Sequence, residues 1–121
     1  MFRIALIGAG RIGQVHAKSI TANKDSRLVA VADVMAEAAE KLAADIGAEA
    51  KSVDAILADD SIDAVLIASS TDTHSDLIER ATAAGKAVLC EKPVDLSLER
   101  ALTALKNADA TGLPVMIGFN R

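Results

Sequence analysis

A glycine-rich hexapeptide near the start of the chain constrains the fold more than any other feature. The sequence GAGRIG at residues 8–13 follows an apolar run at residues 2–7 and precedes a segment of helical character at residues 14–22. A strand that turns through glycines into a helix directs free backbone N–H groups and the positive end of the helix dipole toward one point. This arrangement suits a pyrophosphate, so the pattern predicts a dinucleotide site between a strand and the helix that follows it.

Each glycine of the hexapeptide has a separate steric role. Gly8 permits the tight turn, and Gly10 lets the backbone approach the phosphates without a Cβ in the way. Gly13 lets the helix pack closely against the strand. Between them, Arg11 and Ile12 are expected to contribute backbone N–H groups to the cofactor site.

The motif also requires an acidic residue roughly 20 residues further along the chain, and Asp33 meets that requirement. Its carboxylate would accept hydrogen bonds from the ribose hydroxyls of the adenosine half of the dinucleotide. A turn or helix-capping residue is the alternative role for Asp33. Val34 and Met35, which follow it, supply no cation to neutralise a 2′-phosphate, so the sequence favours NAD over NADP.

Short apolar runs alternate with longer segments of helical period along the whole chain. Strands are expected near residues 2–7, 27–32, 48–51, 63–68, 87–90 and 114–120, and helices near residues 11–22, 36–46, 52–58, 74–84 and 98–110. This alternation predicts an α/β protein with a parallel sheet buried on both faces. Six strands fit the doubly wound order 3-2-1-4-5-6 of a Rossmann fold, a three-layer α/β/α structure that makes one domain of residues 1–121.

The segment after the fourth expected strand should lie beside the glycine turn, because ligands of such sheets bind at the carboxyl ends of the strands. Ser69 and Thr71 belong to this segment and are expected to line the cofactor path. Asp72 and Thr73 could line the same path, and capping of the next helix is an equally open role for Thr71, Asp72 and Thr73 that does not exclude the first. His74 is either a packed side chain or a further cofactor-binding residue.

Lys92 is the strongest candidate for a catalytic residue. It ends the fifth expected strand and precedes Pro93, which restricts the backbone beside the crevice. A surface lysine paired with Glu91 is the alternative for Lys92. Glu91 is interpreted mainly as a structural anchor, and both residues are grouped with the cofactor-binding set.

Composition and spacing argue against several other classes of function. A net charge of −4 gives no support for binding nucleic acid or an anionic membrane surface. No apolar run approaches the roughly 18 residues of a membrane span, and no His, Cys or carboxylate cluster has the spacing of metal ligands. The single cysteine, Cys90, and the absence of a signal-peptide pattern at the start predict a cytoplasmic protein.

Together, these motifs resemble the glucose–fructose oxidoreductase, inositol dehydrogenase and rhizopine catabolism (Gfo/Idh/MocA) family of NAD(P)-dependent dehydrogenases. The similarity runs through residues 8–16, 68–74, 91–93 and 118–121, and it is greatest to the inositol 2-dehydrogenases of the family. The resemblance implies that a hydride passes from a secondary alcohol of a polyol or sugar to NAD, with Lys92 hydrogen-bonding the reacting oxygen.

Members of that family carry a second α/β domain after the Gly-Phe-Asn-Arg segment, which binds substrate, mediates oligomerisation and supplies an aspartate and a histidine that act with the lysine. The sequence ends at Arg121, within that segment, so we expect it to correspond to the cofactor half alone. We therefore expect it to bind NAD, to oxidise polyols very slowly or not at all, and to self-associate through apolar surface that the second domain would cover. A non-catalytic module that binds or senses NAD(H) is the alternative function, and a flavin or S-adenosylmethionine site is a third.

Overall fold

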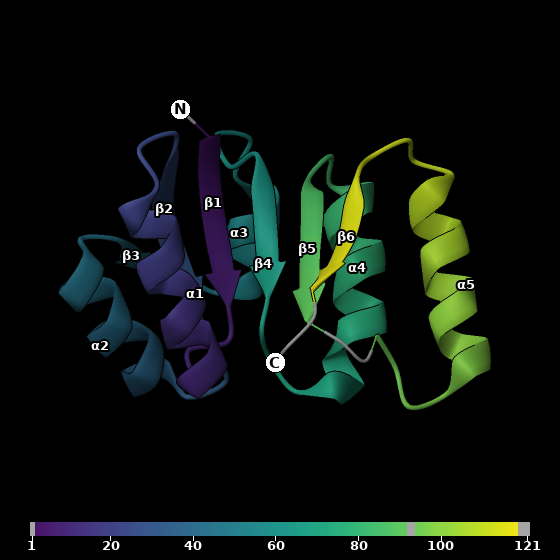
Figure 1. Cartoon of the computed structure of the whole chain (residues 1–121), viewed down its shortest axis with the longest axis horizontal. Helices are drawn as coiled ribbons and strands as arrows, with labels where there is room; N and C mark the ends of the chain where they lie inside the picture. Colours follow the sequence, from purple (N-terminus) through teal and green to yellow (C-terminus); the bar gives the residue numbers. More distant parts are fainter. Residues whose placement is uncertain (1, 92–93, 119–121) are drawn as a thin grey trace.

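A computed structural model describes residues 2–91 and 94–118 of the chain. Its strands form one six-stranded parallel sheet in the order β3-β2-β1-β4-β5-β6 (Figure 1). The strands are β1 (Phe2–Ile7), β2 (Ser26–Ala32), β3 (Glu49–Ala50), β4 (Ala64–Ile67), β5 (Ala87–Glu91) and β6 (Val115–Gly118). The predicted doubly wound order and the Rossmann fold are thus confirmed.

Helices cover both faces of the sheet. Helices α1 (Arg11–Ala22) and α2 (Ala36–Ile46) pack on one face, and α3 (Val53–Ala58), α4 (His74–Ala83) and α5 (Leu98–Asp109) pack on the other. Alternate residues of each central strand serve the two layers. In β1, Ile7 joins the cluster under α3, α4 and α5, whereas Leu6 joins the cluster under α1 and α2.

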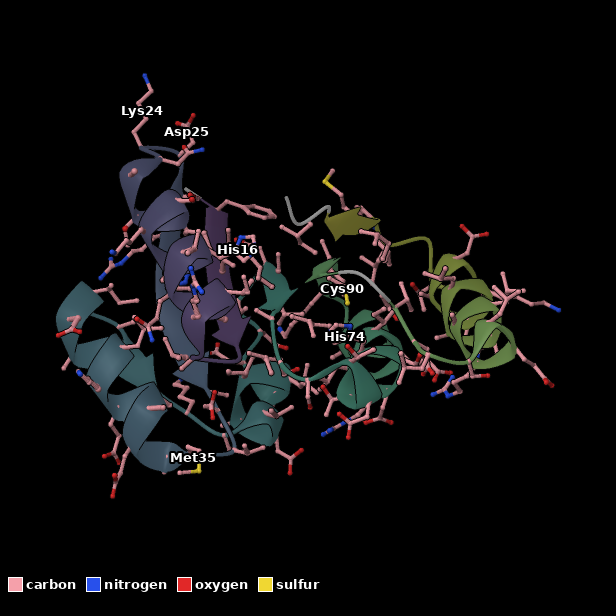
Figure 2. All side chains as sticks on the ribbon, turned by 60° about the horizontal axis from the view of Figure 1, so that its bottom comes forward. His16, Lys24, Asp25, Met35, His74 and Cys90 are labelled. Carbon is pink, nitrogen blue, oxygen red and sulfur yellow. The ribbon has the colours of Figure 1, made fainter. Side chains whose placement is uncertain are left out.

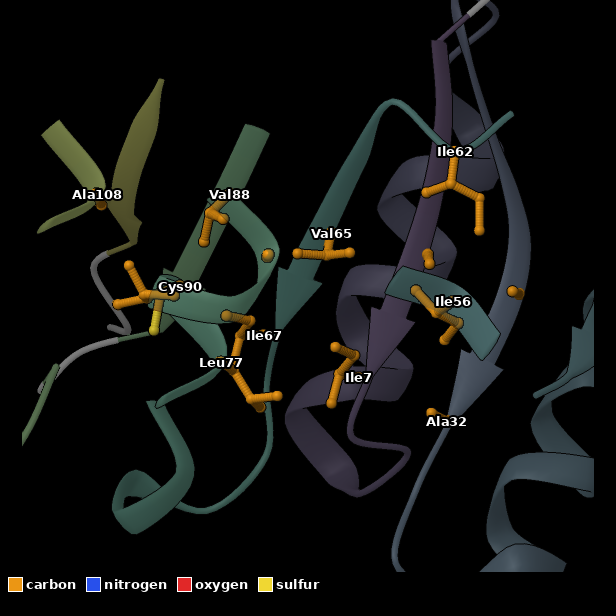
Figure 3. Close-up of a cluster of buried hydrophobic side chains, with 14 residues drawn as sticks. Ile7, Ala32, Ile56, Ile62, Val65, Ile67, Leu77, Val88, Cys90 and Ala108 are labelled. Atoms are coloured by element: carbon orange, nitrogen blue, oxygen red, sulfur yellow. The ribbon is translucent and has the colours of Figure 1, made fainter. Parts of the chain in front are cut away.

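The larger core cluster contains small and branched aliphatic side chains (Figure 3). Ile56 of α3, Val65 and Ile67 of β4, and Leu77 of α4 belong to this cluster and are almost fully buried. Cys90 of β5 is buried in the same cluster.

Local sequence signals account for several helix boundaries. The Ser52 hydroxyl accepts a hydrogen bond from the Ala55 N–H at 3.1 Å and so caps the start of α3. Gly47 ends α2 with a φ of 75°, a left-handed conformation that favours glycine. Both features agree with the predicted boundaries.

The connection between β4 and α4 differs from its prediction. A single 3-10 turn, η1 (Thr71–Thr73), precedes α4, and within the described residues neither η1 nor α4 has a side-chain cap hydrogen bond. The Thr73 hydroxyl instead donates back to the Ser70 carbonyl oxygen at 2.7 Å. The capping role considered for Thr71, Asp72 and Thr73 is therefore wrong, because these residues form their own tight turn.

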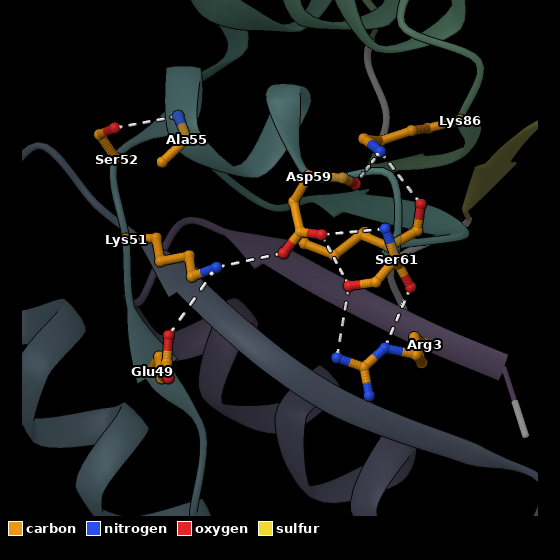
Figure 4. A network of polar contacts seen from close by, with 9 residues as sticks. Arg3, Glu49, Lys51, Ser52, Ala55, Asp59, Ser61 and Lys86 are labelled. Carbon is orange, nitrogen blue, oxygen red and sulfur yellow. Dashed lines mark hydrogen bonds and ion pairs between the residues drawn. The ribbon is translucent and has the colours of Figure 1, made fainter.

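A polar network closes the opposite, amino-terminal edge of the sheet (Figure 4). Lys86 is only 2% exposed, and its Nζ donates to the carbonyl oxygens of Asp59 at 2.7 Å and Ile62 at 3.0 Å. The Asp59 carboxylate accepts hydrogen bonds from Ser61 and Lys51, which hold its pKa well below the usual range. These bonds secure the connections at this edge and leave the carboxyl edge for the candidate site.

Candidate dinucleotide site

A cavity of about 650 Å³ lies at the carboxyl ends of β1, β2 and β4, where the doubly wound topology places a ligand. Its walls come from the glycine turn, the end of β2, the connection after β4, the start of α3 and one side of α4. Gly8, Gly10, Asp33 and Ser69 all line it. The structure therefore brings together predicted residues from three separate segments. A smaller hollow of about 230 Å³ lies near Arg3 and Lys51, far from these motifs in the fold.

The outer glycines of the turn are required by close backbone contacts. Gly8 has a φ of 108°, and a Cβ there would lie 2.5 Å from the Ala68 carbonyl carbon. A Cβ at Gly13 would lie 1.9 Å from the Gly8 carbonyl oxygen, a distance that no side chain tolerates. These contacts support the steric roles that the sequence suggested for Gly8 and Gly13.

Gly10 has a different environment. A Cβ built on Gly10 meets no heavy atom within 4 Å, and the residue lines the cavity at the start of α1. A side chain here would enter the cavity rather than the protein, so the missing Cβ leaves a cradle over the helix amino terminus. This cradle fits a pyrophosphate, because the first N–H groups of the 12-residue helix α1, from Arg11 onward, point away from the helix and have no intrahelical acceptor. Arg11, Ile12 and Gly13 themselves form the first turn of the helix and not the cavity wall.

Asp33 lies beside this cradle and binds two backbone N–H groups. Its Oδ1 accepts from the Met35 N–H at 2.8 Å, which is the turn role considered as the alternative for this residue. Its Oδ2 accepts from the Ala9 N–H at 2.6 Å, a contact across to the glycine turn. Asp33 nevertheless lines the cavity, so its structural bonds do not remove it from the candidate site. Met35 projects outward at the margin of the fold (Figure 2).

The connection after β4 is held together by side-chain hydrogen bonds. The hydroxyls of Ser69 and Thr73 lie 2.7 Å apart, and His74 Nε2 donates to the Ser69 carbonyl oxygen at 2.9 Å. Ser69 and Thr73 line the cavity, whereas Thr71 is not part of its wall. His74, the first residue of α4, is 2% exposed, and its side chain lies inside the fold (Figure 2). Its hydrogen bond to Ser69 holds the connection after β4 in place.

Asp76 and Arg80 of α4 line the cavity, and the sequence offered no role for either of them. They lie four residues apart, the spacing that aligns side chains on one face of a helix, and Asp72, which was considered for the cofactor path, lies four residues before Asp76 in η1. Arg80 forms ion pairs with Asp54 and, at 3.8 Å, with Asp76. The four-residue spacing of these charged residues, directly after a predicted central strand, is the sequence signal that could have identified them as cavity residues. Ser52 and Val53 at the start of α3 complete the same wall.

The predicted catalytic residue Lys92 lies outside the described residues, and for Glu91 the structure describes the backbone, which pairs with Gly118 in β6. The chain is anchored again shortly after this point. The buried Ser75 hydroxyl, in the first turn of α4, donates to the Asp95 carboxylate at 2.8 Å. Hydrogen bonds from the Ser97 N–H and from Ser75 lower the pKa of Asp95. Asp95 thus ties the segment after Pro93 to α4, a contact that no sequence pattern indicated.

The described residues form neither a metal site nor a membrane-spanning helix. Among residues 2–91 and 94–118, no group of three or more His, Cys, Asp or Glu side chains could hold a metal ion. In the same part of the chain, no helix combines the length and the apolar character that crossing a bilayer requires.

Comparison with known proteins agrees with the geometry. A family model described as "Oxidoreductase family, NAD-binding Rossmann fold" (GFO_IDH_MocA) matches residues 2–119. An inositol 2-dehydrogenase of Rhizobium meliloti is 55% identical over 98% of the chain. Among solved structures, a myo-inositol dehydrogenase of Corynebacterium glutamicum superposes with a TM-score of 0.90 at 47% identity over 98% of the chain. GenD2 from gentamicin A biosynthesis, solved in complex with NAD, superposes with a TM-score of 0.92 at 33% identity over 97% of the chain.

The matches differ from the chain in length. The chain spans 36% of the R. meliloti enzyme and of the C. glutamicum structure, and 34% of GenD2.

Proposed function

The chain belongs to the Gfo/Idh/MocA family of oxidoreductases with an NAD-binding Rossmann fold, and on that basis we propose that it is the NAD-binding domain of a dehydrogenase acting on an inositol-like polyol or sugar. The observation that carries the proposal is the open cradle at Gly10, which shares a cavity with Asp33. The similarity to inositol dehydrogenases supports the substrate class.

Residues in the cavity wall and in the adjoining first turn of α1 could each bind one part of NAD. The N–H groups of Arg11 and Ile12, together with the dipole of α1, would hold the pyrophosphate over Gly10. The Asp33 carboxylate would accept hydrogen bonds from the adenosine ribose, since two oxygens offer about four acceptor positions and only two are used by backbone donors. Ser69 and Thr73 would line the path of the cofactor. When bound, NAD supplies a nicotinamide ring that accepts or donates a hydride.

The charges around the cavity favour NAD over NADP. Asp33, Asp72 and Asp76 place three carboxylates on the wall, where they would repel a 2′-phosphate. No cation follows Asp33 in the sequence, but the structure adds one, Arg80, to the same wall. Arg80 forms ion pairs with Asp54 and Asp76, and one guanidinium against three carboxylates leaves the charge of the wall negative.

The catalytic part of the proposal rests on the family resemblance. Lys92 would hydrogen-bond the oxygen that changes between alcohol and ketone, with Glu91 as its structural neighbour. The chain on its own should bind NAD without efficient catalysis, because it spans about a third of the length of the dehydrogenases that it matches. Incubation with NAD and myo-inositol should produce no NADH above background, and robust turnover would contradict this expectation.

Titration calorimetry tests the binding proposal. The 121-residue chain is titrated with NAD and with NADP, alongside Asp33→Ala and the matched control Asp60→Ala, which removes an exposed carboxylate outside the cavity. We expect NAD to bind more tightly than NADP, and Asp33→Ala to weaken NAD by about tenfold or more through lost charge-assisted hydrogen bonds. A folded chain that does not bind NAD, or an Asp33→Ala variant that binds NAD as tightly as Asp60→Ala, would overturn the proposal.

Self-association is a separate part of the proposal. Several large apolar side chains are exposed at the α5 and β6 end of the fold, among them Leu98 at 74%, Leu102 at 58% and Met116 at 67%. Exposed apolar surface on this scale would favour contact with another protein surface. Light scattering should show concentration-dependent association that Leu98→Glu with Leu102→Glu reduces, and a clean monomer at high concentration would refute it.

A further inference from the structure

The Asp33 carboxylate joins two segments that the sheet alone does not connect. One oxygen binds the Met35 N–H in the next turn of its own segment, and the other binds the Ala9 N–H in the glycine turn. The contact to Ala9 is 2.6 Å long and spans 24 residues of sequence. Hydrogen bonds to an ionised acceptor are the stronger kind.

The Ala9 N–H has a special position between two regular elements. The Gly8 N–H before it donates to the Ala32 carbonyl oxygen at 2.8 Å and so extends the pairing of β1 with β2. The Gln14 N–H after it donates to the Gly10 carbonyl oxygen at 2.9 Å within α1. The Ala9 N–H belongs to neither pattern, and Ala9 is only 3% exposed. A buried N–H without a partner is costly, so the path of the backbone at Ala9 depends on the Asp33 side chain.

We infer that Asp33 is a positioning residue for the pyrophosphate, acting through Ala9, in addition to its contact with the adenosine ribose. Ala9 immediately precedes Gly10, so fixing the Ala9 N–H also fixes the orientation of the cradle and of the first N–H groups of α1. This inference deepens the proposed function and rests on it. Its distinctive consequence is that loss of Asp33 should weaken ligands that have no ribose hydroxyls at all.

Nucleotide analogues separate the two roles of Asp33. ADP and 2′,3′-dideoxy-ADP share the pyrophosphate, but the second has no ribose hydroxyl for a carboxylate to bind. Asp33→Ala removes both the charge and the acceptor of the Ala9 N–H. Asp60→Ala is the matched control, because it removes an exposed carboxylate outside the cavity. Both ligands are titrated into the full chain and the two variants.

The positioning role predicts that Asp33→Ala weakens 2′,3′-dideoxy-ADP by about tenfold relative to Asp60→Ala. If Asp33 acts through the ribose alone, removing its carboxylate should leave dideoxy-ADP binding unchanged or improve it. Equal dideoxy-ADP affinities in the two variants would therefore overturn the inference.

Amide hydrogen exchange provides a readout that needs no ligand. In Asp33→Ala, the Ala9 amide should exchange at least about tenfold faster than in the original chain, while the Gly8 amide, bonded to β2, should keep its protection. Preserved Gly8 protection also shows that the variant is folded. Unchanged protection at Ala9 would reject the inference even where NAD binds. Failure of the folded chain to bind NAD or ADP would instead reject the proposed function. The exchange result at Ala9 would still report whether Asp33 holds the Ala9 N–H.

Discussion

Substitution of Gly10 by alanine separates ligand binding from folding. A Cβ at Gly10 meets no protein atom within 4 Å, and the residue has φ −75° and ψ −167°, a conformation open to all residues. Alanine restricts the unfolded chain, which stabilises the protein by about 0.4–1 kcal/mol. Loss of the glycine preference at a helix N-cap costs a similar amount, on the order of 0.5–1 kcal/mol. The free energy of unfolding should therefore change by less than about 1 kcal/mol.

The effect on NAD should be much larger. The new methyl group would project into the cavity where the pyrophosphate approaches the amino terminus of α1. Displacing the phosphates from even one backbone N–H forfeits a hydrogen bond to a charged group, which is worth about 1.5–3 kcal/mol. The dissociation constant for NAD should then rise by about 10- to 150-fold.

Calorimetry with NAD and urea denaturation measure the two effects on the same samples. Gly112→Ala is the matched control, because Gly112 has a φ of 75° and open space around its Cβ position, outside the cavity. It should lose about 1–2 kcal/mol of stability through backbone strain and keep its NAD affinity. If Gly10→Ala binds NAD like the original chain, the pyrophosphate does not occupy the cradle and the reasoning fails.

Three further substitutions test other parts of the structure. Gly13→Ala places a Cβ 1.9 Å from a backbone carbonyl oxygen of the glycine turn, so it should lower the unfolding free energy by at least about 3 kcal/mol, and an unchanged urea midpoint would contradict this packing. Lys86→Ala removes a buried side chain that donates to two backbone carbonyls, and denaturation should show a loss of about 2–4 kcal/mol; a loss below about 0.5 kcal/mol would count against its anchoring role. Hydrogen bonds from Asn107 and Arg100 lower the pKa of Glu79 from 4.5, so its contribution to stability is present above that pH and is lost as the pH falls further. Glu79→Gln should reduce the loss of stability between neutral and acidic pH, and parallel pH profiles for the two proteins would refute the assignment.

The sequence predicts the regular parts of this structure because its signals there are local and repeated. The bounds of β1, α1 and α2 agree with the predicted ranges, and Gly47 and Ser52 mark the helix boundaries expected of them. The strand order could also be predicted from the sequence, because a chain of alternating strands and helices can form only a few sheet topologies. The tight turn at residues 71–73 was missed because hydroxyl side chains suit caps and turns equally well.

The site could be predicted only in part. The glycines and Asp33 belong to a motif whose spacing is visible along the chain, but the wall formed by α3 and α4 is created by tertiary packing. The bond from Asp33 to Ala9 and the bond from Ser75 to Asp95 each join residues 20 or more positions apart. Buried Lys86 reads as an ordinary charged surface residue until its neighbours are known.

The contact between Gly8 and the backbone at Ala68 and Ser69 bears on how such domains can be recombined. A Cβ at Gly8 would lie 2.5–2.6 Å from three backbone atoms of that neighbouring connection, so neither segment can shift alone. In a chimera that takes the glycine turn from one relative and the connection after β4 from another, the backbones of the two segments would not pack closely at Gly8. The two segments are separated by about sixty residues of sequence and should be exchanged together. Insertions should be tolerated in other loops of the domain but not in either of these two segments.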